Sequence, residues 1–218
     1  MLLRVLDLKK SFATEEGTLD VLRGVDLELA AGERLALTGD SGCGKSTLLY
    51  LIGALEAFDA GEVWINGQSL AGLGDRQRAA LRRDCVGIIF QQFNLIPSLN
   101  VAHNLRFHAR LAGREDSQWI DELTQRLGLS AFLSAYPEQL SGGQQQRVAI
   151  GRTLAARPKL ILADEPTGNL DEKTSDEVIT LMLQLVEESG AGLLMVTHSS
   201  RMAGRMDRQL HLSSGLVS

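Results

Sequence analysis

Short apolar stretches of two kinds run along the chain. In residues 25–29 and 61–68 apolar and polar residues alternate, which is typical of strands with one buried face. Four other runs are almost wholly apolar, as expected of strands buried on both faces. They are RLALT (34–38), VGIIF (86–90), LILAD (160–164) and GLLMVT (192–197). Helical patterns separate these runs, so the alternation predicts an α/β fold around a mostly parallel sheet.

The middle of the chain has a different character. Segments such as HNLRFHARLAG (103–113) and SQWIDELTQRLGL (117–129) carry apolar residues at helical spacing, with no buried strand among them. We therefore expect a single domain over residues 1–218. Its α/β core comprises 1–92 and 157–218, and residues 93–156 form an inserted helical subdomain.

Composition narrows the classes of function. Of the 218 residues 44% are hydrophobic and 22% charged, an ordinary globular balance, and the formal net charge is −5. A weakly acidic chain is a poor candidate for sequence-independent binding of nucleic acid. The two cysteines, Cys43 and Cys85, give no disulfide framework and fit a reducing cytosol. No apolar run approaches the ~20 residues that span a bilayer, so we expect a soluble intracellular protein whose membrane role comes through a partner.

The segment GDSGCGKST (39–47) directly follows the expected strand RLALT and fits the pattern G-x-x-x-x-G-K-[ST]. Glycines let the backbone turn its N–H groups around phosphate oxygens, and the following helix N-terminus adds a favourable dipole. Lys45 reaches the β- and γ-phosphates, and the Ser46 hydroxyl is a ligand for Mg²⁺. A glycine turn that only caps a helix would leave Lys45 unexplained, so the segment predicts nucleotide binding.

Two carboxylates end the apolar run LILADE (160–165), at the edge where parallel sheets bind ligands. Asp164 is placed to hold Mg²⁺ directly or through water, and Glu165 to orient or deprotonate an attacking water. Strand ends often carry solvated acids, so this motif alone is weak. Together with the phosphate loop it predicts a catalytic site.

Two other strand ends carry polar residues that suit the same site. His198 follows GLLMVT, where it is a candidate γ-phosphate contact and water organiser, and Gln91 follows VGIIF, where its amide is offered to metal or water. Each also has a plain structural interpretation, because polar residues commonly lie where a strand meets a loop. Their placement beside Glu165 would decide between the two.

In combination, these motifs resemble the nucleotide-binding subunits of ATP-binding cassette (ABC) transporters, over essentially the whole chain. GDSGCGKS is similar to the Walker A element, LILADE to Walker B, LSGGQ (140–144) to the signature, and GNLD (168–171) to the D-loop. Gln91 matches the Q-loop and His198 the switch histidine. The resemblance implies a P-loop NTPase core with a mostly parallel sheet, an antiparallel β subdomain and an inserted α-helical subdomain.

The resemblance also assigns residues to ATP and Mg²⁺. The expected catalytic residues are Glu165, His198, Lys45 and Gln91, and the expected metal ligands are Ser46, Gln91 and Asp164. Phe12 matches the aromatic that the family stacks on adenine, without the hydroxyl of the more usual Tyr; its other interpretation is an apolar residue ending the first strand. The expected ATP-binding residues are Phe12, Gly39, Ser41, Gly42, Cys43, Gly44, Lys45, Ser46 and Thr47.

LSGGQ implies a second copy of the chain. In the family two subunits face head to tail, and each signature loop addresses the ATP held by the partner's Walker A. The expected residues are Ser141, Gly142, Gly143 and Gln144, with Asp171 coupling the two sites. The chain is therefore expected to form a homodimer on binding ATP, which hydrolysis then releases.

Longer stretches, including FQQFNLIPSLNVAHNL (90–105) and DEPTGNLD (164–171), resemble the branch with lipoprotein-releasing, macrolide-export and cell-division cassettes. There the cassette drives separate membrane permease subunits from the cytoplasmic face of the inner membrane, for export, lipid or lipoprotein extraction, or periplasmic mechanical work. The permease would dock near residues 91–105. Apolar Phe93, Leu95, Ile96 and Leu99 fit that docking, or else they pack the helical subdomain.

Two other functions remain open at this point. One is the ATPase of a small-solute importer, for example of amino acids, although GNLD differs from the S-A-L-D usual there. The other is an ABC ATPase that works on DNA or ribosomes. Fewer than a hundred residues without sustained heptads separate Walker A from the signature, and the charge is acidic, so we expect no nucleic-acid partner. The cargo, the transport direction and the permease's identity cannot be deduced from these residues.

Overall fold

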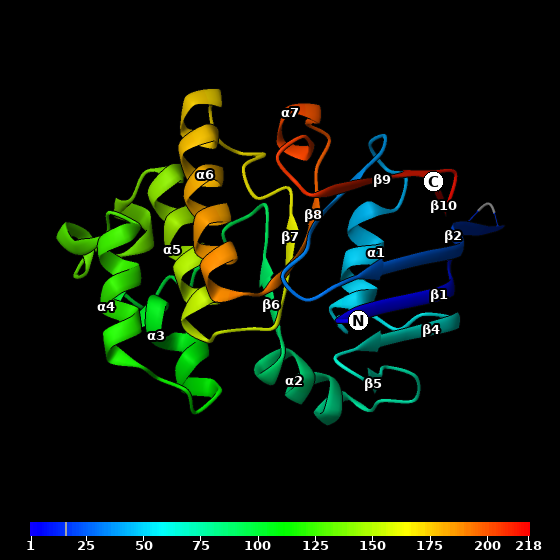
Figure 1. Cartoon of the computed structure of the whole chain (residues 1–218), viewed down its shortest axis with the longest axis horizontal. Helices are drawn as coiled ribbons and strands as arrows, with labels where there is room; N and C mark the ends of the chain where they lie inside the picture. The colour runs from blue at the N-terminus through cyan, green and yellow to red at the C-terminus, as the bar shows by residue number, and fades with distance from the viewer. Residues whose placement is uncertain (16) are drawn as a thin grey trace.

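The computed structural model describes residues 1–15 and 17–218 and contains two sheets (Figure 1). The larger sheet has six strands in the order β10-β9-β3-β8-β7-β6, and all its pairs are parallel except β9–β10. Its strands are β3 (Arg34–Thr38), β6 (Val86–Ile89), β7 (Leu160–Asp164), β8 (Gly192–Val196), β9 (Arg208–Ser213) and β10 (Leu216–Val217). The four apolar runs of the sequence are thus confirmed as strands. Phe90 and Thr197 lie just beyond the ends of β6 and β8.

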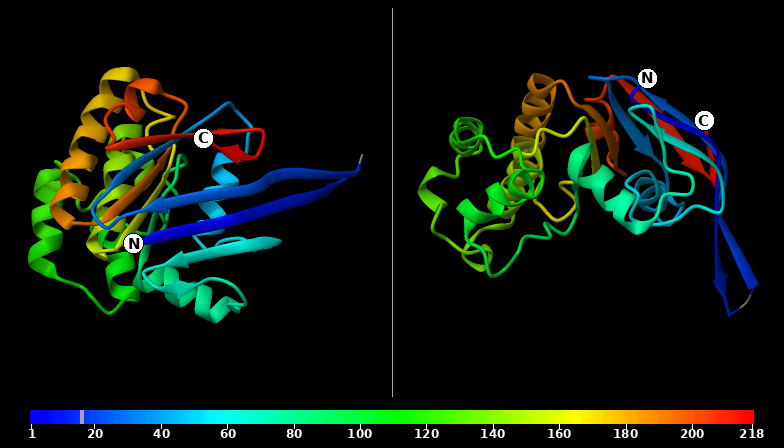
Figure 2. Two further views of the ribbon diagram at one scale, coloured as in Figure 1. Left: turned by 45° about the vertical axis from the view of Figure 1, so that its right-hand side comes forward. Right: turned by 90° about the horizontal axis from the view of Figure 1, so that it is seen from below.

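The second sheet is antiparallel, with the order β2-β1-β4-β5. Its strands are β1 (Leu3–Thr14), β2 (Gly17–Leu29), β4 (Ala60–Ile65) and β5 (Gln68–Ser69). Asn66 and Gly67 join β4 to β5. Their φ angles are positive, 48° and 79°, as a tight Asn-Gly hairpin requires. Strand β2 starts well before the alternating stretch 25–29, and its hairpin with β1 projects from the body of the molecule (Figure 2).

The helices are α1 (Lys45–Ile52), α2 (Asp75–Asp84), α3 (Val101–Leu111), α4 (Ser117–Arg126), α5 (Gly142–Ala155), α6 (Glu172–Ser189) and α7 (Ser200–Ala203). Helices α3, α4 and α5 gather at one end of the molecule (Figure 1), with the 3₁₀ turns η1 (Ser130–Phe132) and η2 (Pro137–Gln139). No strand interrupts residues 93–156, all of which the structure describes. The mixed α/β class, with an antiparallel sheet and an inserted helical part, is confirmed.

The two faces of β7 belong to different hydrophobic cores, because successive strand residues point to opposite sides. Leu160 and Leu162 pack with α1 and the antiparallel sheet. Ile161 and Ala163 pack with α3, α4, α5 and α6. Helices α1 and α5 therefore lie on opposite faces of one sheet (Figures 1 and 2).

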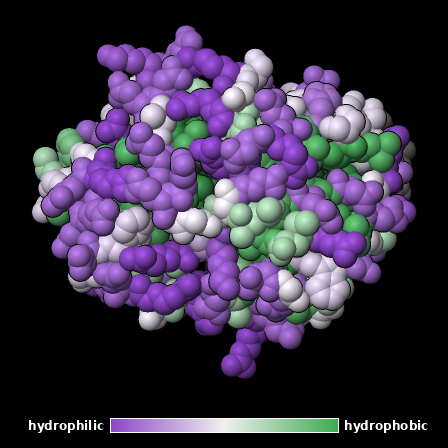
Figure 3. Space-filling view, in the orientation of Figure 1, coloured by the Kyte–Doolittle hydropathy of each residue, from purple (hydrophilic) through white to green (hydrophobic). Residues whose placement is uncertain are grey.

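The surface seen in Figure 3 is mostly polar, with small apolar areas between charged residues. Across residues 1–15 and 17–218, none of the helices combines the length and apolar character that a bilayer crossing requires.

Candidate active site

The phosphate loop joins β3 to α1 at the carboxyl edge of the large sheet. Gly39, Gly42 and Gly44 have φ angles of 147°, 76° and 103°, which side chains other than hydrogen rarely tolerate. Gly44 is the N-cap of α1, and no side chain caps this helix. The first backbone N–H groups of α1 are thus left to the loop and to whatever binds in it.

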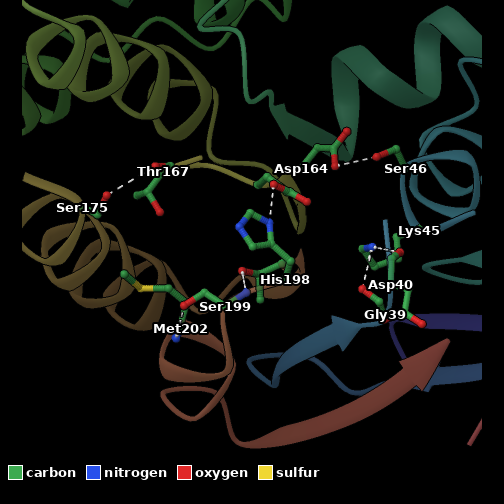
Figure 4. Close-up of polar contacts among 12 residues, drawn as sticks. Gly39, Asp40, Lys45, Ser46, Asp164, Thr167, Ser175, His198, Ser199 and Met202 are labelled. Atoms are coloured by element: carbon green, nitrogen blue, oxygen red, sulfur yellow. Dashed lines mark hydrogen bonds and ion pairs between the residues drawn. The ribbon is translucent and has the colours of Figure 1, made fainter. Parts of the chain in front are cut away.

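Lys45 turns back into this loop. Its side chain is only 6% exposed, and its Nζ donates hydrogen bonds to the carbonyl oxygens of Gly39 at 2.9 Å and Asp40 at 2.7 Å (Figure 4). The backbone carbonyls hold the ammonium group at the centre of the loop. A buried cation surrounded by glycine backbone is the arrangement expected of a phosphate site.

Asp164, the last residue of β7, is buried beside α1. Its Oδ1 accepts a hydrogen bond from Ser46 Oγ at 2.9 Å (Figure 4), and its Oδ2 accepts one from Tyr50 Oη at 3.0 Å. Burial first, and then the bond to this carboxylate, raise the pKa of Tyr50 to about 12. The fold thus brings together Ser46 and Asp164, which lie 118 positions apart in the chain.

Glu165 leaves the strand with a φ of 42°, which is unfavourable for a residue other than glycine. Its backbone N–H donates to the carbonyl of Val196 at 3.0 Å, which fixes this turn against β8. Its Oε2 lies 2.8 Å from Nδ1 of His198 (Figure 4). The carboxylate is largely covered, whereas the imidazole is 66% exposed. Strained backbone that aims a carboxylate at a cavity is characteristic of functional sites.

Gln91 follows β6 and reaches the same place. A Cβ on Gly168 would lie 2.9 Å from Gln91 Nε2 and 3.3 Å from Glu165 Oε2, so both side chains converge over this glycine. Asn169 Nδ2 also donates to the backbone carbonyl of Gln91 at 2.9 Å. Gln91, Glu165 and His198 therefore meet as the sequence suggested, and polar residues at three strand ends form one cluster.

An open cavity of about 260 Å³ lies between the phosphate loop and Glu165. Its lining consists of Val21, Ser41, Gly42, Gly44, Lys45, Ser46, Thr47 and Glu165. Most of the predicted nucleotide-binding residues are therefore in one wall. Gly39, Cys43, Phe12, Gln91 and His198 are outside the lining. Phe12 is half-buried on β1, and the ammonium of Lys10 lies 4.9 Å from the centre of its ring.

The LSGGQ segment starts α5. Ser141 is its N-cap: Ser141 Oγ accepts from Gln144 N at 3.3 Å, and Gln144 Oε1 accepts from Ser141 N at 2.8 Å. Gly143 packs against helix α6, since a Cβ there would stand 2.5 Å from the Thr174 methyl carbon. This second glycine-rich helix start lies across the sheet from the phosphate loop, and Gly142 and Gly143 line no part of its cavity.

Asp171 is the N-cap of α6, next to the signature segment. Its Oδ1 accepts from Thr174 N at 3.0 Å, and hydrogen bonding from Thr174 is the largest cause that lowers the pKa of Asp171. Thr174 therefore touches both predicted interface motifs, because its methyl group also faces Gly143. The two motifs are therefore packed together within one chain.

The segment after Gln91 is held from inside by two buried side chains that sequence reasoning missed. Asn104 of α3 accepts from Ile96 N at 2.9 Å and donates to Leu99 O at 2.8 Å. Arg152 of α5 donates to Asn94 O at 2.7 Å and Phe93 O at 3.2 Å. Burial lowers the pKa of Arg152 to about 10. Phe93, Leu95, Ile96 and Leu99 are all half-buried.

An apolar groove of about 300 Å³ runs beside that segment, between α2, β6 and α3. Its lining includes Leu55, Ile88, Phe90 and Leu111, with Arg82 and Arg83 of α2 at the cationic side. Leu55 and Leu111 are 45% and 59% exposed, which is unusual for large apolar residues on one small area. Leu95, in contrast, packs against the helical core.

Tyr50 was also missed, although a signal for it existed. It follows Ser46 by four positions on α1, and residues four apart share one face of a helix. Once Ser46 was assigned to the site, Tyr50 was a neighbour. Asn104 and Arg152 gave no such signal, because their partners are backbone atoms of the irregular segment after Gln91 and belong to no motif.

A glycine phosphate loop, a buried lysine and a strand-end pair of acids on a P-loop α/β core define an ATPase. A family profile described as "ABC transporter" matches residues 22–168. The chain belongs to the ABC transporter family and is an ATP-binding, ATP-hydrolysing cassette. The resemblance drawn from its motifs is confirmed.

Bacterial ATP-binding proteins are similar to this chain over nearly its whole length. The lipoprotein-releasing system ATP-binding protein LolD of Ruegeria sp. (strain TM1040) is 46% identical over 219 residues, covering 99% of this chain and 96% of that protein. The uncharacterized ABC transporter ATP-binding protein YbbA of Escherichia coli (strain K12) is 44% identical, with 98% and 95% covered.

Among solved structures, a dimeric post-hydrolysis state of the ATP-binding cassette MJ0796 bound to ADP and Pi matches with a TM-score of 0.91 and 37% identity. The match covers 100% of this chain and 97% of that one. A dimeric structure of MJ0796, described as a bacterial ABC transporter cassette, gives a TM-score of 0.90 and 38% identity, with the same coverage.

Proposed function

We propose that this chain powers a lipoprotein-releasing type of ABC transporter, as one of two identical ATPase subunits on a membrane permease. Relatives named for lipoprotein release are 44–46% identical over nearly the whole chain, and these support the export branch over a small-solute importer. The structural observation that carries the dimer is the separation of two anion-binding helix starts on opposite faces of one sheet.

The ATP phosphates bind in the loop from Gly39 to Thr47. Lys45 already lies inside it, held at 2.9 and 2.7 Å by two backbone carbonyls that phosphate oxygens can replace as partners. The uncapped N–H groups of α1 point the same way. Phe12 stacks on adenine in this proposal, at the projecting β1–β2 hairpin, where Lys10 now covers its ring.

The residues present fit a magnesium ion. Mg²⁺ prefers oxygen ligands and takes one or two from carboxylates or hydroxyls with the rest from phosphate and water. Ser46 lines the cavity, its Oγ lies 2.9 Å from Oδ1 of the buried Asp164, and Gln91 brings an amide close to Glu165. When bound, the ion neutralises charge on the transferred phosphate. Ser46, Asp164 and Gln91 are the groups proposed to hold it.

Glu165 accepts the proton of the attacking water. It lines the cavity and is largely covered, and His198 stands 2.8 Å from its Oε2. His198 can hold this carboxylate in position while its exposed face meets the γ-phosphate. Gln91 beside Glu165 orients the water through its amide.

Two copies complete the sites head to tail. Ser141 is exposed and Gln144 closes its own cap, so the α5 start needs nothing from its own phosphate loop. It can present N–H groups to the γ-phosphate held by a partner. Asp171, beside it at the start of α6, couples the two sites.

A mixed dimer tests this sharing. Lys45→Ala disables the phosphate loop and Ser141→Arg blocks the signature, so forced pairs of the two mutants keep one site free of both changes. We expect roughly half of the wild-type ATPase from this pair, and less than about a hundredth from either mutant alone. Activity of the mixed pair no higher than that of the single mutants would contradict the shared site.

The permease docks beside the segment 91–105, and the apolar groove next to it supplies the exposed contact. In this proposal residues 93–156 form the helical subdomain that receives it, and residues 1–92 and 157–218 form the core. The chain then lies at the cytoplasmic face of the inner membrane through its permease. Leu111→Glu, at 59% exposure, should abolish stimulation of the ATPase by the permease and leave ATP affinity unchanged.

Leu216→Glu on β10 is the matched control, because Leu216 is similarly exposed at 51% but distant from the groove. If the permease stimulated the ATPase of wild type and of Leu111→Glu equally, the docking proposal would be wrong.

A further inference from the structure

Tyr50 donates a hydrogen bond to the carboxylate of Asp164, and neither the family motifs nor the assigned roles use it. Its Oη lies 3.0 Å from Oδ2, whereas Ser46 Oγ lies 2.9 Å from Oδ1. Both donors come from one face of α1, because they are four residues apart. Each oxygen of this buried carboxylate therefore has its own hydroxyl donor from the same helix.

The ring of Tyr50 makes a second contact that fixes the hydroxyl. It packs against Phe90 with ring centres 6.4 Å apart and an angle of 51° between the planes, a tilted pair. Phe90 is the residue directly before Gln91. Tyr50 thus bridges the helix of the phosphate loop, the end of β7 and the strand that delivers Gln91.

We propose that Tyr50 is a positioning residue for the divalent cation that accompanies ATP, acting by holding Asp164 in one orientation. This inference rests on the proposed role of Ser46 and Asp164 in holding Mg²⁺. With Oδ2 bonded to Tyr50, the carboxylate cannot rotate and exchange its two oxygens, so Oδ1 stays beside Ser46. Fixing a ligand through a hydrogen bond to its other oxygen is a general way to raise affinity for a metal ion.

The geometry distinguishes this role from packing alone. Phenylalanine would fill the same space against Phe90, so packing does not require a hydroxyl at this position. The hydroxyl donates its hydrogen bond to Asp164, which is only 6% exposed and already accepts one hydrogen bond from Ser46. A second donor adds orientation, because a carboxylate with one bonded oxygen can still turn.

The test is Tyr50→Phe, which removes the donor and keeps the ring. Binding of a fluorescent ATP analogue is measured with Mg²⁺ and with EDTA, in the Glu165→Gln background so that no turnover occurs. We expect Tyr50→Phe to weaken binding with Mg²⁺ by about tenfold, the usual effect of losing a hydrogen bond to a charged group, and to leave binding in EDTA within twofold. The concentration of Mn²⁺ that gives half-maximal binding, followed by electron paramagnetic resonance, should rise similarly.

Tyr136→Phe is the matched control. Tyr136 is the only other tyrosine of the chain, it is 45% exposed, and it lies at the start of the 3₁₀ turn η2 in the helical part of the molecule. This variant should bind Mg²⁺ and ATP as wild type does. If Tyr50→Phe weakened binding equally with and without Mg²⁺, Tyr50 would be a packing residue and the inference would be wrong.

A spectroscopic measurement needs no destabilising change at the site. In the Tyr136→Phe protein, 3-fluorotyrosine labels position 50 alone. Its ¹⁹F resonance should shift when Mg²⁺ is added to the ATP-bound protein, because the bonded carboxylate gains a cation as neighbour. No shift, with ATP bound, would overturn the positioning role. Failure of wild type to bind ATP more tightly with Mg²⁺ than with EDTA would instead refute the proposed metal site itself.

Discussion

Helices α1 and α5 both begin with glycine-rich turns, but their first turns are completed in different ways. Gly44 caps α1 without any side-chain bond, so the N–H groups there are free to bind a phosphate. Ser141 and Gln144 cap α5 reciprocally, which satisfies the backbone N–H groups of these two residues. The first is a site that needs a ligand, and the second is a preformed surface.

The two regions also differ in how many parts of the chain build them. The phosphate site gathers residues from the ends of β3, β6, β7 and β8. Its lysine is held by carbonyls of its own loop, whereas its buried acid Asp164 depends on partners more than a hundred positions away. The α5 start is built mainly from neighbours in sequence and one contact with α6. Changes at the first should affect chemistry, and changes at the second should affect assembly.

The largest effect is expected from Glu165→Gln. Loss of the proposed general base should lower ATP hydrolysis by about 10²- to 10⁴-fold while ATP binding is retained, because the phosphate loop is untouched. ATP should then hold the protein as a stable dimer in size-exclusion chromatography. The same change at Glu122, on the exposed side of α4, should alter neither property. A wild-type rate of ATP hydrolysis in Glu165→Gln would show that Glu165 is not the general base.

Acid should weaken the helical side of the molecule through His108 of α3. Burial first, and then the charge of Arg152, lower the pKa of His108 to about 4. In the unfolded chain its pKa is about 6.5, so between pH 6.5 and 4 the unfolded state binds more protons. The free energy of unfolding should therefore decrease as the pH is lowered from 6.5 to 4, by up to about 3 kcal/mol from this group.

Urea unfolding at pH 7.5 and pH 4.5 measures that dependence. His108→Gln removes the titrating group, so its free energy of unfolding should depend less on pH than that of wild type. An unchanged slope in the variant would show that other groups cause the loss in acid.

Gly143→Ala should break the contact between α5 and α6. The new methyl group would stand 2.5 Å from the Thr174 methyl carbon, well inside van der Waals distance. We expect a loss of about 1–3 kcal/mol in the free energy of unfolding, measured with urea, and lower ATPase at unchanged ATP affinity. Thr174→Ser removes the opposing methyl, so the double variant should recover most of the loss. No recovery would mean that the glycine is needed for another reason.

The smallest expected change in stability comes from Ser141→Ala, at about 1 kcal/mol for a lost N-cap. Asp116→Ala removes the equivalent N-cap of α4, whose carboxylate accepts from Trp119 N at 3.1 Å, and should cost a similar amount. Only Ser141→Ala should also reduce the ATPase rate, because only Ser141 belongs to the proposed shared site. Equal ATPase rates in the two variants would show that Ser141 acts only as the N-cap of α5.

Pattern and motif predicted most of the fold and the main parts of the site. Strand positions such as Arg34–Thr38 and Leu160–Asp164 followed from apolar runs, because burial on both faces leaves a clear signal. Strands β9 and β10 were not predicted: β9 carries mostly exposed polar residues and β10 has only two residues, so the apolar signal of both is weak. The length of β2 was missed for the same reason, since its first residues are exposed.

Within the site, the residues that were found are those whose roles require a particular side chain at a strand end or a glycine turn. Convergence of Gln91, Glu165 and His198 followed from the rule that parallel strands end at one edge. Asn104 and Arg152 were missed because their importance comes from hydrogen bonds to the backbone of the irregular segment after Gln91, whose course no local pattern encodes. Tyr50 was missed because its importance comes from one bond to Asp164, 114 positions along the chain, and its spacing of four from Ser46 was the signal for it.

Arg152 connects helix α5 rigidly to the loop that follows Gln91. The helix begins at the signature glycines, and ten residues later Arg152 donates hydrogen bonds to the carbonyl oxygens of Phe93 and Asn94. At 1.5 Å per residue these points are about 15 Å apart on one stiff rod. In the proposed assembly, movement of the loop beside the groove would therefore move the signature end of α5, which faces the ATP of the partner. In the opposite direction, closure of the dimer would move the loop and with it the membrane subunit.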